Sequence, residues 1–143
     1  MPRQLLTKST GTDINWKNID DVSKLCQASL EASYRRLSFL NRDPSALIVH
    51  RNGKFCRFVA SSNFGFYIQP AQLSEDQKLL AIDVNDDPYP ADFDSSDASD
   101  WVNVRSKGDI LETIYSSTII LKDGYSYTLL TYDDECFADN AYS

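Results

Sequence analysis

The sequence holds one histidine, three cysteines and five glycines among its 143 residues. With His50 as the sole imidazole and no CxxC or HxxxH pair, a zinc site would lack recognisable ligands. An odd number of widely spaced cysteines argues against a disulfide framework and for thiols in a reducing compartment. No two glycines are close enough for a GxGxxG motif or a P-loop, which disfavours the common nucleotide enzymes. We therefore expect neither a metal centre nor another cofactor.

Long apolar runs are missing as well. No segment approaches the roughly 18 apolar residues that a membrane-spanning helix needs. The N-terminal stretch MPRQLLTKSTGT also lacks the apolar region of a secretory signal. The sequence therefore predicts a cytoplasmic protein with no membrane partner.

Enough apolar material is present for a packed core. Apolar residues make up 42% of the chain, and seventeen residues are aromatic. A single core is typical for a chain of this length. We predict one α+β domain over residues 1–143, in which an N-terminal amphipathic helix packs on a mainly antiparallel sheet formed from two hairpins.

The predicted helix covers residues 18–40, where apolar side chains recur at helical spacing. Asn18 is a suitable N-cap, and Pro44 favours an end before it because the residue preceding proline avoids the α region. Cys26 falls on the apolar face and is expected in the core. Residues 1–17 are polar and are predicted to be a loose lead-in.

Two dipeptides, Asn52-Gly53 and Asp123-Gly124, favour hairpin turns because these residue types tolerate positive φ angles. The first turn joins predicted strands at 46–50 and 55–60, and the second lies within residues 117–132. Further strands are predicted at 65–68, 78–84 and 101–105, and a short helix at 109–115. The acidic tail, residues 133–143, is predicted to fray.

Charge is distributed unevenly along the chain, whose net charge is −7. Residues 1–78 carry eleven Lys and Arg against seven Asp and Glu, whereas residues 79–143 carry three against fourteen. Such asymmetry creates a field that steers association with an oppositely charged partner. It also makes direct nucleic-acid binding by the C-terminal half unfavourable, since phosphates would be repelled.

The stretch DVNDDPYPADFDSSDASDW, residues 83–101, concentrates this charge in seven aspartates with no basic residue. Its prolines and aspartates predict an acidic loop over residues 85–100. Asp83-x-Asn85-x-Asp87 opens like an EF-hand loop, but Pro88 stands where glycine is needed and Asp94 where a bidentate glutamate is needed. A solvated loop, incidental cation binding and protein recognition are the alternatives that remain.

Recognition is the interpretation we carry forward, because the carboxylates alternate with aromatic residues of the kind that anchor interfaces. It predicts a non-enzymatic inhibitor, immunity-type or anti-defence factor that blocks a basic protein partner, such as a nuclease or another nucleic-acid-handling protein. No catalytic residue is assigned. The predicted protein-binding residues are Asp83, Asp86, Asp87, Tyr89, Asp92, Phe93, Asp94, Asp97, Asp100 and Trp101.

Two other functions remain open. A small metal-assisted hydrolase would use some of the loop aspartates, with His50 as its acid/base group. An RNA-binding module would use basic residues interleaved with aromatics between positions 34 and 58. Its basic residues would be Arg35, Arg36, Arg42, Arg51, Lys54 and Arg57.

The segment RNGKFCRFVASSNFGFYIQP, residues 51–70, resembles the hairpin of plasmid antirestriction proteins of the ArdB/KlcA kind, and residues up to 93 follow that family loosely. The matching residues are Arg51, Gly53, Phe58, Asn63, Gly65, Phe66, Tyr67 and Pro70. Phe64 departs from a family glycine, and the second predicted hairpin stands where the family is helical. The resemblance implies interference with host restriction without catalysis, which belongs to the same inhibitor class.

Overall fold

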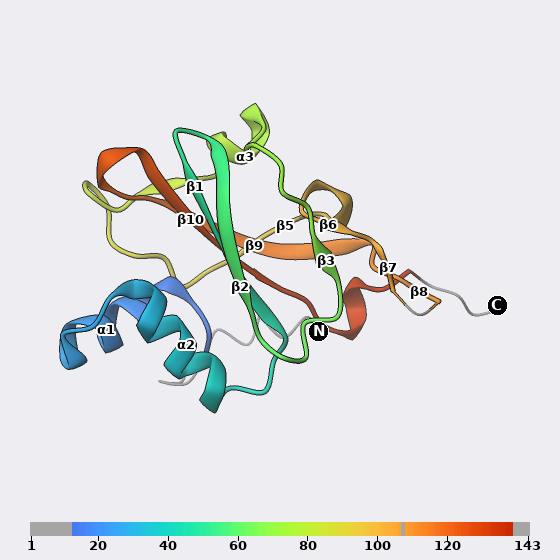
Figure 1. Cartoon of the computed structure of the whole chain (residues 1–143), viewed down its shortest axis with the longest axis horizontal. Helices are drawn as coiled ribbons and strands as arrows, with labels where there is room; N and C mark the ends of the chain where they lie inside the picture. The colour runs from blue at the N-terminus through green and yellow to red at the C-terminus, as the bar shows by residue number, and fades with distance from the viewer. Residues whose placement is uncertain (1–12, 107, 139–143) are drawn as a thin grey trace.

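The computed structural model describes residues 13–106 and 108–138 of the chain. Its α-helices are α1 (Trp16–Cys26), α2 (Leu30–Leu40) and α3 (Glu75–Leu79) (Figure 1). No helix within these described ranges is long and apolar enough to cross a bilayer. The strands are β1 (Ser45–Arg51), β2 (Lys54–Ala60), β3 (Tyr67–Ile68), β4 (Ile82–Asp83), β5 (Asp94–Asp97), β6 (Val102–Asn103), β7 (Arg105–Ser106), β8 (Asp109–Ile110), β9 (Thr113–Ile120) and β10 (Tyr125–Thr131). The 3₁₀ turns are η2 (Ala98–Asp100), η3 (Lys122–Gly124) and η4 (Asp134–Cys136).

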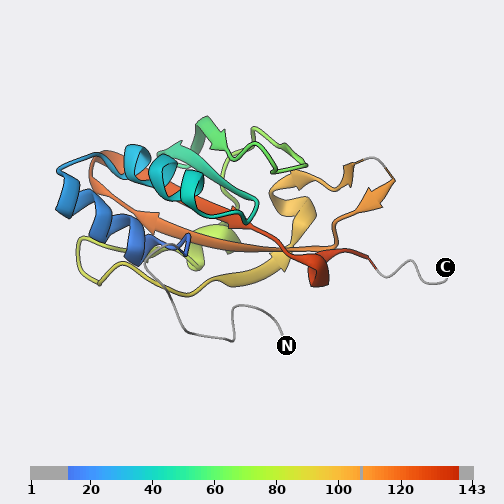
Figure 2. The ribbon, with the colours of Figure 1, turned by 90° about the horizontal axis from the view of Figure 1, so that it is seen from below.

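One sheet organises the fold, in the strand order β2-β1-β10-β9-β4, with β5 also paired to β9. Its pairs are antiparallel except for β4 with β9. Helices α1 and α2 lie on one face of this sheet (Figure 2). The predicted α+β class, with N-terminal helical structure on a mainly antiparallel sheet, is confirmed.

Both predicted hairpins form, β1–β2 and β9–β10, around the predicted dipeptides. The φ angles are 52° and 81° at Asn52 and Gly53, and 62° and 81° at Asp123 and Gly124. The two turns lie side by side, since the Asn52 backbone N–H donates to the Gly124 carbonyl at 2.8 Å. A Cβ at position 124 would displace the Asn52 side chain, and the φ of 81° there favours glycine in its own right.

The central strands are buried on both faces of the sheet. Successive side chains of a strand point to opposite faces, so Leu47 and Ile48 of β1 enter different cores, as do Leu129 and Leu130 of β10. The helix-side core consists of Ile14, Trp16, Ile19, Tyr34, Leu37, Leu47, Val49, Ile119 and Leu129. The opposite core consists of Ala46, Ile48, Phe66, Ile68, Leu73, Ala98, Trp101, Val102, Leu111, Ile114, Leu130, Tyr132 and Cys136.

The N-terminal helix predicted over residues 18–40 is two helices. Gln27 ends α1 in the left-handed region with φ 52°, and the Ser29 side chain caps the start of α2. The N-cap of α1 is Asn15 rather than Asn18. The change of direction leaves Cys26 exposed, so its predicted place in the core is wrong.

Trp16 attaches α1 to the sheet. Its side chain is completely buried, and its Nε1 donates to the Ser117 carbonyl at 2.8 Å. Ser117 lies in β9 between the residues that pair with β5 and those that pair with β4. Because Ile14 and Trp16 are buried, the predicted loose lead-in is wrong from residue 14 onward. Residues 1–12 of that prediction lie outside the described ranges.

Several short elements also differ from prediction. Residues 78–84 were expected to form one strand, but the Ser74–Gln77 capping box starts α3 and leaves β4 only two residues. The short helix predicted at 109–115 is wrong, because Asp109–Ile110 form β8 and β9 begins at Thr113. The strands predicted at 65–68 and 101–105 are represented by β3 and β6, which pair with each other.

The acidic tail is folded over its described part. Cys136 is completely buried, and the Phe137 ring lies 5.7 Å from Tyr132 and 5.8 Å from Phe66, measured between centroids. These contacts attach residues 133–138 to the opposite core, so the predicted fraying is wrong there. Residues 139–143 lie outside the described ranges.

We expect Trp16→Phe to lower the free energy of unfolding by about 1–3 kcal/mol, because the Ser117 carbonyl loses its donor in a buried environment. Trp16→Ala should cost more, about 3–5 kcal/mol, because it also leaves a cavity. Urea denaturation measures both. Phe39→Ala, at a side chain that is 87% exposed, serves as control. Equal stability of Trp16→Phe and the wild type would contradict the anchoring role.

Candidate functional site

The acidic stretch follows the edge of the sheet beyond β9. It begins in β4, which pairs with the C-terminal part of β9, and returns as β5, which pairs antiparallel with Thr113–Ser116. The prediction of a loop throughout residues 85–100 is therefore wrong for β5 and η2. Pairing with β9 supplies hydrogen bonds that outweigh the weak strand propensity of aspartate and serine. We call this surface, formed by β4, β5 and the aspartates of residues 83–100, the acidic edge.

Asp83 has a structural role at the start of this edge. Its carboxylate accepts hydrogen bonds from the backbone and the side-chain amide of Asn85, both at 2.9 Å. The Asp83 carbonyl accepts further bonds from the backbones of Asp86 and Asp87. These bonds close a tight turn that presents Asp86 and Asp87 to solvent.

The three aromatic residues predicted to contact a partner turn inward instead. Tyr89 and Phe93 are half-buried against the helix-side core, and the Lys17 backbone N–H donates to the Pro90 carbonyl at 3.0 Å. Trp101 is only 5% exposed and belongs to the opposite core. These residues hold the stretch against the fold and do not form an exposed group of anchors.

The carboxylates of the edge face solvent. Asp86, Asp87, Asp92, Asp94, Asp97 and Asp100 are all exposed. Within residues 13–106 and 108–138, no aspartate of the edge forms an ion pair. The ion pairs there join Lys17–Asp21, Lys24–Asp20, Arg35–Glu31, Arg57–Glu31 and Lys78–Glu75.

The carboxyl group of Asp100 lies near other carboxylates where the edge meets α3. Partial burial, followed by the nearby carboxylates of Asp97 and Asp76, raises the pKa of Asp100 above its usual value. Partial burial alone raises the pKa of Asp94. Asp76 thus joins the edge from α3, whose Gln77 side chain donates to the Asp100 carbonyl at 3.1 Å.

Exposed apolar side chains accompany the carboxylates, and the sequence analysis did not identify them. Leu79 is 81% exposed, and Leu80 and Ile82 are 45% and 36% exposed. The chain places them between Asp76 and Asp83, both of which belong to the same surface. The signal that could have located them is Ser74-x-x-Gln77, a capping-box pattern that predicts the short helix α3.

His50 and the cysteines do not assemble a reactive site. His50 is 2% exposed, its Nε2 lies 2.9 Å from the Ala71 carbonyl, and burial lowers its pKa. Its Nδ1 is buried and has no hydrogen-bond partner among the residues that the structure describes. Cys26 and Cys56 are exposed, whereas Cys136 is buried in the opposite core. No group of three or more metal-ligating side chains occurs in the described part of the chain.

The basic residues considered for RNA binding are partly engaged in the fold. Arg57 of β2 and Arg35 of α2 both pair with Glu31, at 2.6 and 3.2 Å. These guanidinium groups lower the pKa of Glu31. Arg51 lies over the Tyr125 ring, 4.9 Å from its centroid. The Arg57–Glu31 pair joins α2 to the outermost strand β2, whereas the Arg35–Glu31 pair lies within α2.

Comparisons with known proteins give no relative, since no family model, curated protein or solved structure matches the chain.

We expect Asp100→Asn to raise the thermal midpoint at pH 7. The folded-state pKa of Asp100 lies above its unfolded value, so ionisation destabilises the folded state as pH rises through the folded pKa. The gain should disappear near pH 3, where the wild-type carboxyl is protonated, and should shrink at high salt. Calorimetric scans over pH and salt test this, with Asp109→Asn as control. A gain that persists at pH 3 would exclude the electrostatic cause.

Proposed function

We propose that the protein is a non-enzymatic binding protein, of an inhibitor, immunity or anti-defence type, that blocks a basic partner through the acidic edge. The observation that supports this most directly is the edge itself, where six exposed aspartates gather without an ion pair among the described residues. A row of fixed carboxylates presents charge of the same sign as nucleic-acid phosphates. It therefore suits the basic groove of a nuclease or another nucleic-acid-handling protein.

Electrostatics would act mainly on the rate of association. Charges separated by more than the Debye length, about 8 Å at physiological ionic strength, are largely screened. Several carboxylates along one edge still raise the encounter rate with a cationic surface and orient it, and that gain falls as salt is added. Affinity also requires contacts that exclude water once the partner has docked.

The exposed apolar residues beside α3 suit this second requirement. Leu79, Leu80 and Ile82 are exposed and could supply the apolar contacts that the aromatic residues of the acidic stretch do not supply, because those aromatic residues pack inward. An apolar centre bordered by charge is the arrangement in which central side chains contribute most of the binding energy and the rim sets specificity. The free side of β5, which pairs only with β9 among the described strands, adds unpaired backbone groups for a partner segment.

We expect the triple variant Asp86→Asn, Asp87→Asn, Asp92→Asn to bind its partner at least about tenfold more weakly, mainly through slower association. The partner is the protein that the immobilised wild type captures from the native cell and releases in a salt gradient. Surface plasmon resonance across ionic strength measures the rates.

The matched control is Asp21→Asn, Asp109→Asn, Asp134→Asn, which changes the net charge equally at exposed positions outside the acidic edge. It should leave the association rate within about twofold of wild type, as surface charges away from an interface do. Equal losses in the two triple variants would show that net charge alone matters and would contradict a role for the edge.

The apolar part of the surface makes a separate prediction. Leu79→Ser should speed dissociation by about tenfold while leaving the salt dependence of association unchanged, because the side chain contributes packing and no charge. Leu25→Ser is the control, since Leu25 is 85% exposed but lies at the end of α1. If both variants dissociate from the partner at the wild-type rate, Leu79 is not part of the interface.

A further inference from the structure

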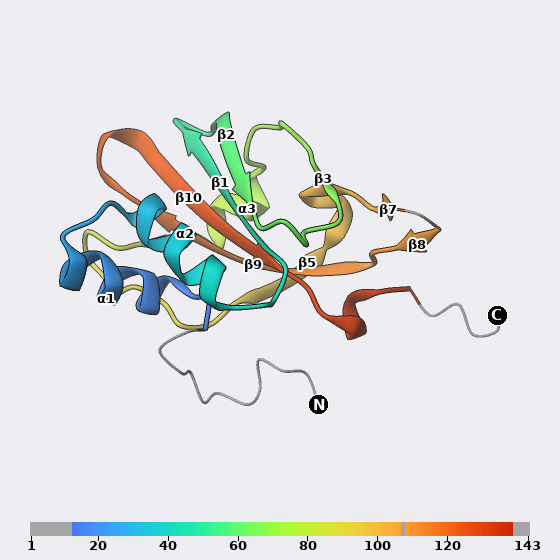
Figure 3. The same ribbon diagram turned by 60° about the horizontal axis from the view of Figure 1, so that its bottom comes forward.

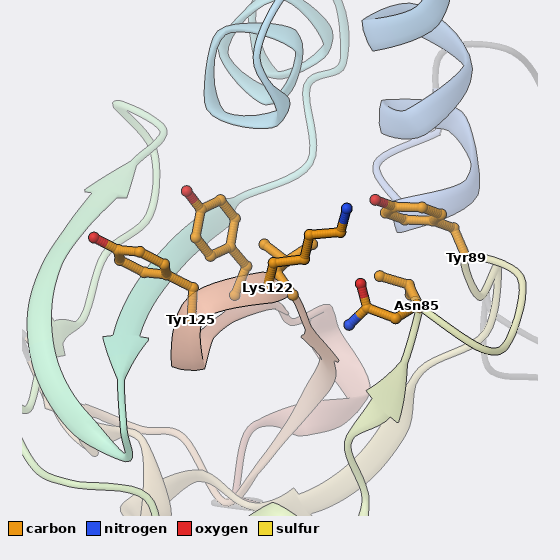
Figure 4. A pocket seen from close by; sticks show the side chains of 7 residues that line it. Asn85, Tyr89, Lys122 and Tyr125 are labelled. Carbon is orange, nitrogen blue, oxygen red and sulfur yellow. The ribbon is translucent and has the colours of Figure 1, made fainter.

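A cavity of about 340 Å³ lies beside the β9–β10 turn. Lys122 and Tyr125 line it from the hairpin, and Asn85 and Tyr89 line it from the turn that follows β4 (Figure 4). Tyr127 adds a third aromatic ring. Cavities of this volume are within the range that holds small ligands in proteins.

The cavity has an apolar base that belongs to the rigid part of the molecule. Val84 and Leu121 line it, and both pack against the helix-side core, as do Tyr89, Tyr125 and Tyr127. The Tyr127 ring lies 6.2 Å from the ring of Trp16. The walls are therefore held by buried neighbours, so a flat ligand would meet a preformed surface.

Positive charge adjoins the cavity although the whole chain carries −7. Lys122 is exposed and forms no ion pair with any residue in the described ranges, and its ammonium extends across the opening toward Tyr89 (Figure 4). Arg51 lies over the outer ring of the site, 4.9 Å from the centroid of Tyr125. An anionic group entering here would find an ammonium without a competing carboxylate bonded to it.

We propose that this cavity binds a small planar aromatic anion, with its ring against the tyrosines and its acidic group on the Lys122 ammonium. Aromatic rings offer stacking and edge contacts to a flat apolar body. A charge-assisted hydrogen bond from the ammonium fixes the orientation of the anionic group. This site adjoins the acidic edge at Asn85 and Tyr89, but its ligand is a small molecule and not the protein partner of that edge.

Two further features narrow the class of ligand. The Tyr89 hydroxyl lines the cavity as a hydrogen-bond donor, as any tyrosine hydroxyl is at neutral pH, and partial burial and the nearby Asp20 carboxylate raise its pKa further. Asp86 and Asp87 follow Asn85 directly and are exposed, so an extended polyanion such as nucleic acid would be repelled at the same opening. The site therefore selects a compact ligand with one acidic group over a polyphosphate chain.

Isothermal titration calorimetry with 1-naphthoate as the probe tests the proposal, with 1-naphthalenemethanol and hexanoate as matched compounds. The first matched compound keeps the rings without the charge, and the second keeps the charge without the rings. We expect naphthoate to saturate one site below about 1 mM and both matched compounds to bind at least about tenfold more weakly. Amide NMR shifts should fall within residues 84–89 and 121–127.

Variants then assign the anion to Lys122. Lys122→Met should weaken naphthoate binding about tenfold and leave naphthalenemethanol unchanged, whereas Lys122→Arg should restore most of the affinity. Arg105→Met removes one positive charge from β7, at the end of the molecule opposite the β9–β10 turn (Figure 3), and should change nothing. The proposal is overturned if naphthoate does not saturate by about 1 mM, if the alcohol binds equally well, or if Lys122→Met and Arg105→Met have equal effects.

Discussion

The fold depends on a central strand pair that is apolar on both faces. Six successive residues of β1 are buried, and the adjacent residues Leu129 and Leu130 of β10 enter different cores. Such a sheet is stable only when both faces are covered. Helices α1 and α2 cover one face, but residues 13–106 and 108–138 contain no second helix pair for the other. Short strands, turns and the described part of the tail form that cover, which is why Trp101 and Phe137 are drawn into the opposite core.

The need to cover the sheet also fixes the position of the acidic stretch. Leaving β4, it must pass α1 and return to pair with β9, and the bond from Lys17 to Pro90 and the packing of Phe93 hold it along this path. Aspartates on an edge strand also have a structural benefit, because charge discourages pairing with another copy of the chain. That benefit accounts for some acidity on β5. It does not account for Asp86 and Asp87, which lie in a turn outside the paired strands.

Sequence patterns predicted correctly the structural elements that depend on a few residues adjacent in the chain. Asn52-Gly53 and Asp123-Gly124 identify both long hairpins because the turn requires backbone angles that these residues adopt readily. Residues 18–40 mislead because their apolar spacing continues through the break at Gln27, where tertiary packing selects a left-handed residue. Trp101 misleads for a related reason. Its position after a run of aspartates shows that Trp101 is near negative charge in the sequence. The sequence does not show that the ring packs into the opposite core and away from solvent.

Inward packing of the aromatics changes how the acidic edge would bind. A mobile acidic loop loses backbone freedom when a partner orders it, at roughly 1–2 kcal/mol for each residue fixed. Here the packing of Tyr89, Phe93 and Trp101 against the cores orders the stretch when the protein folds. The apolar burial of these side chains offsets the entropy that is lost. The carboxylates are then presented in a fixed arrangement, so association forgoes less entropy and can depend on a few exposed side chains. An ordered edge with its anchors turned inward is therefore compatible with recognition, provided that the apolar contacts come from Leu79 and its neighbours.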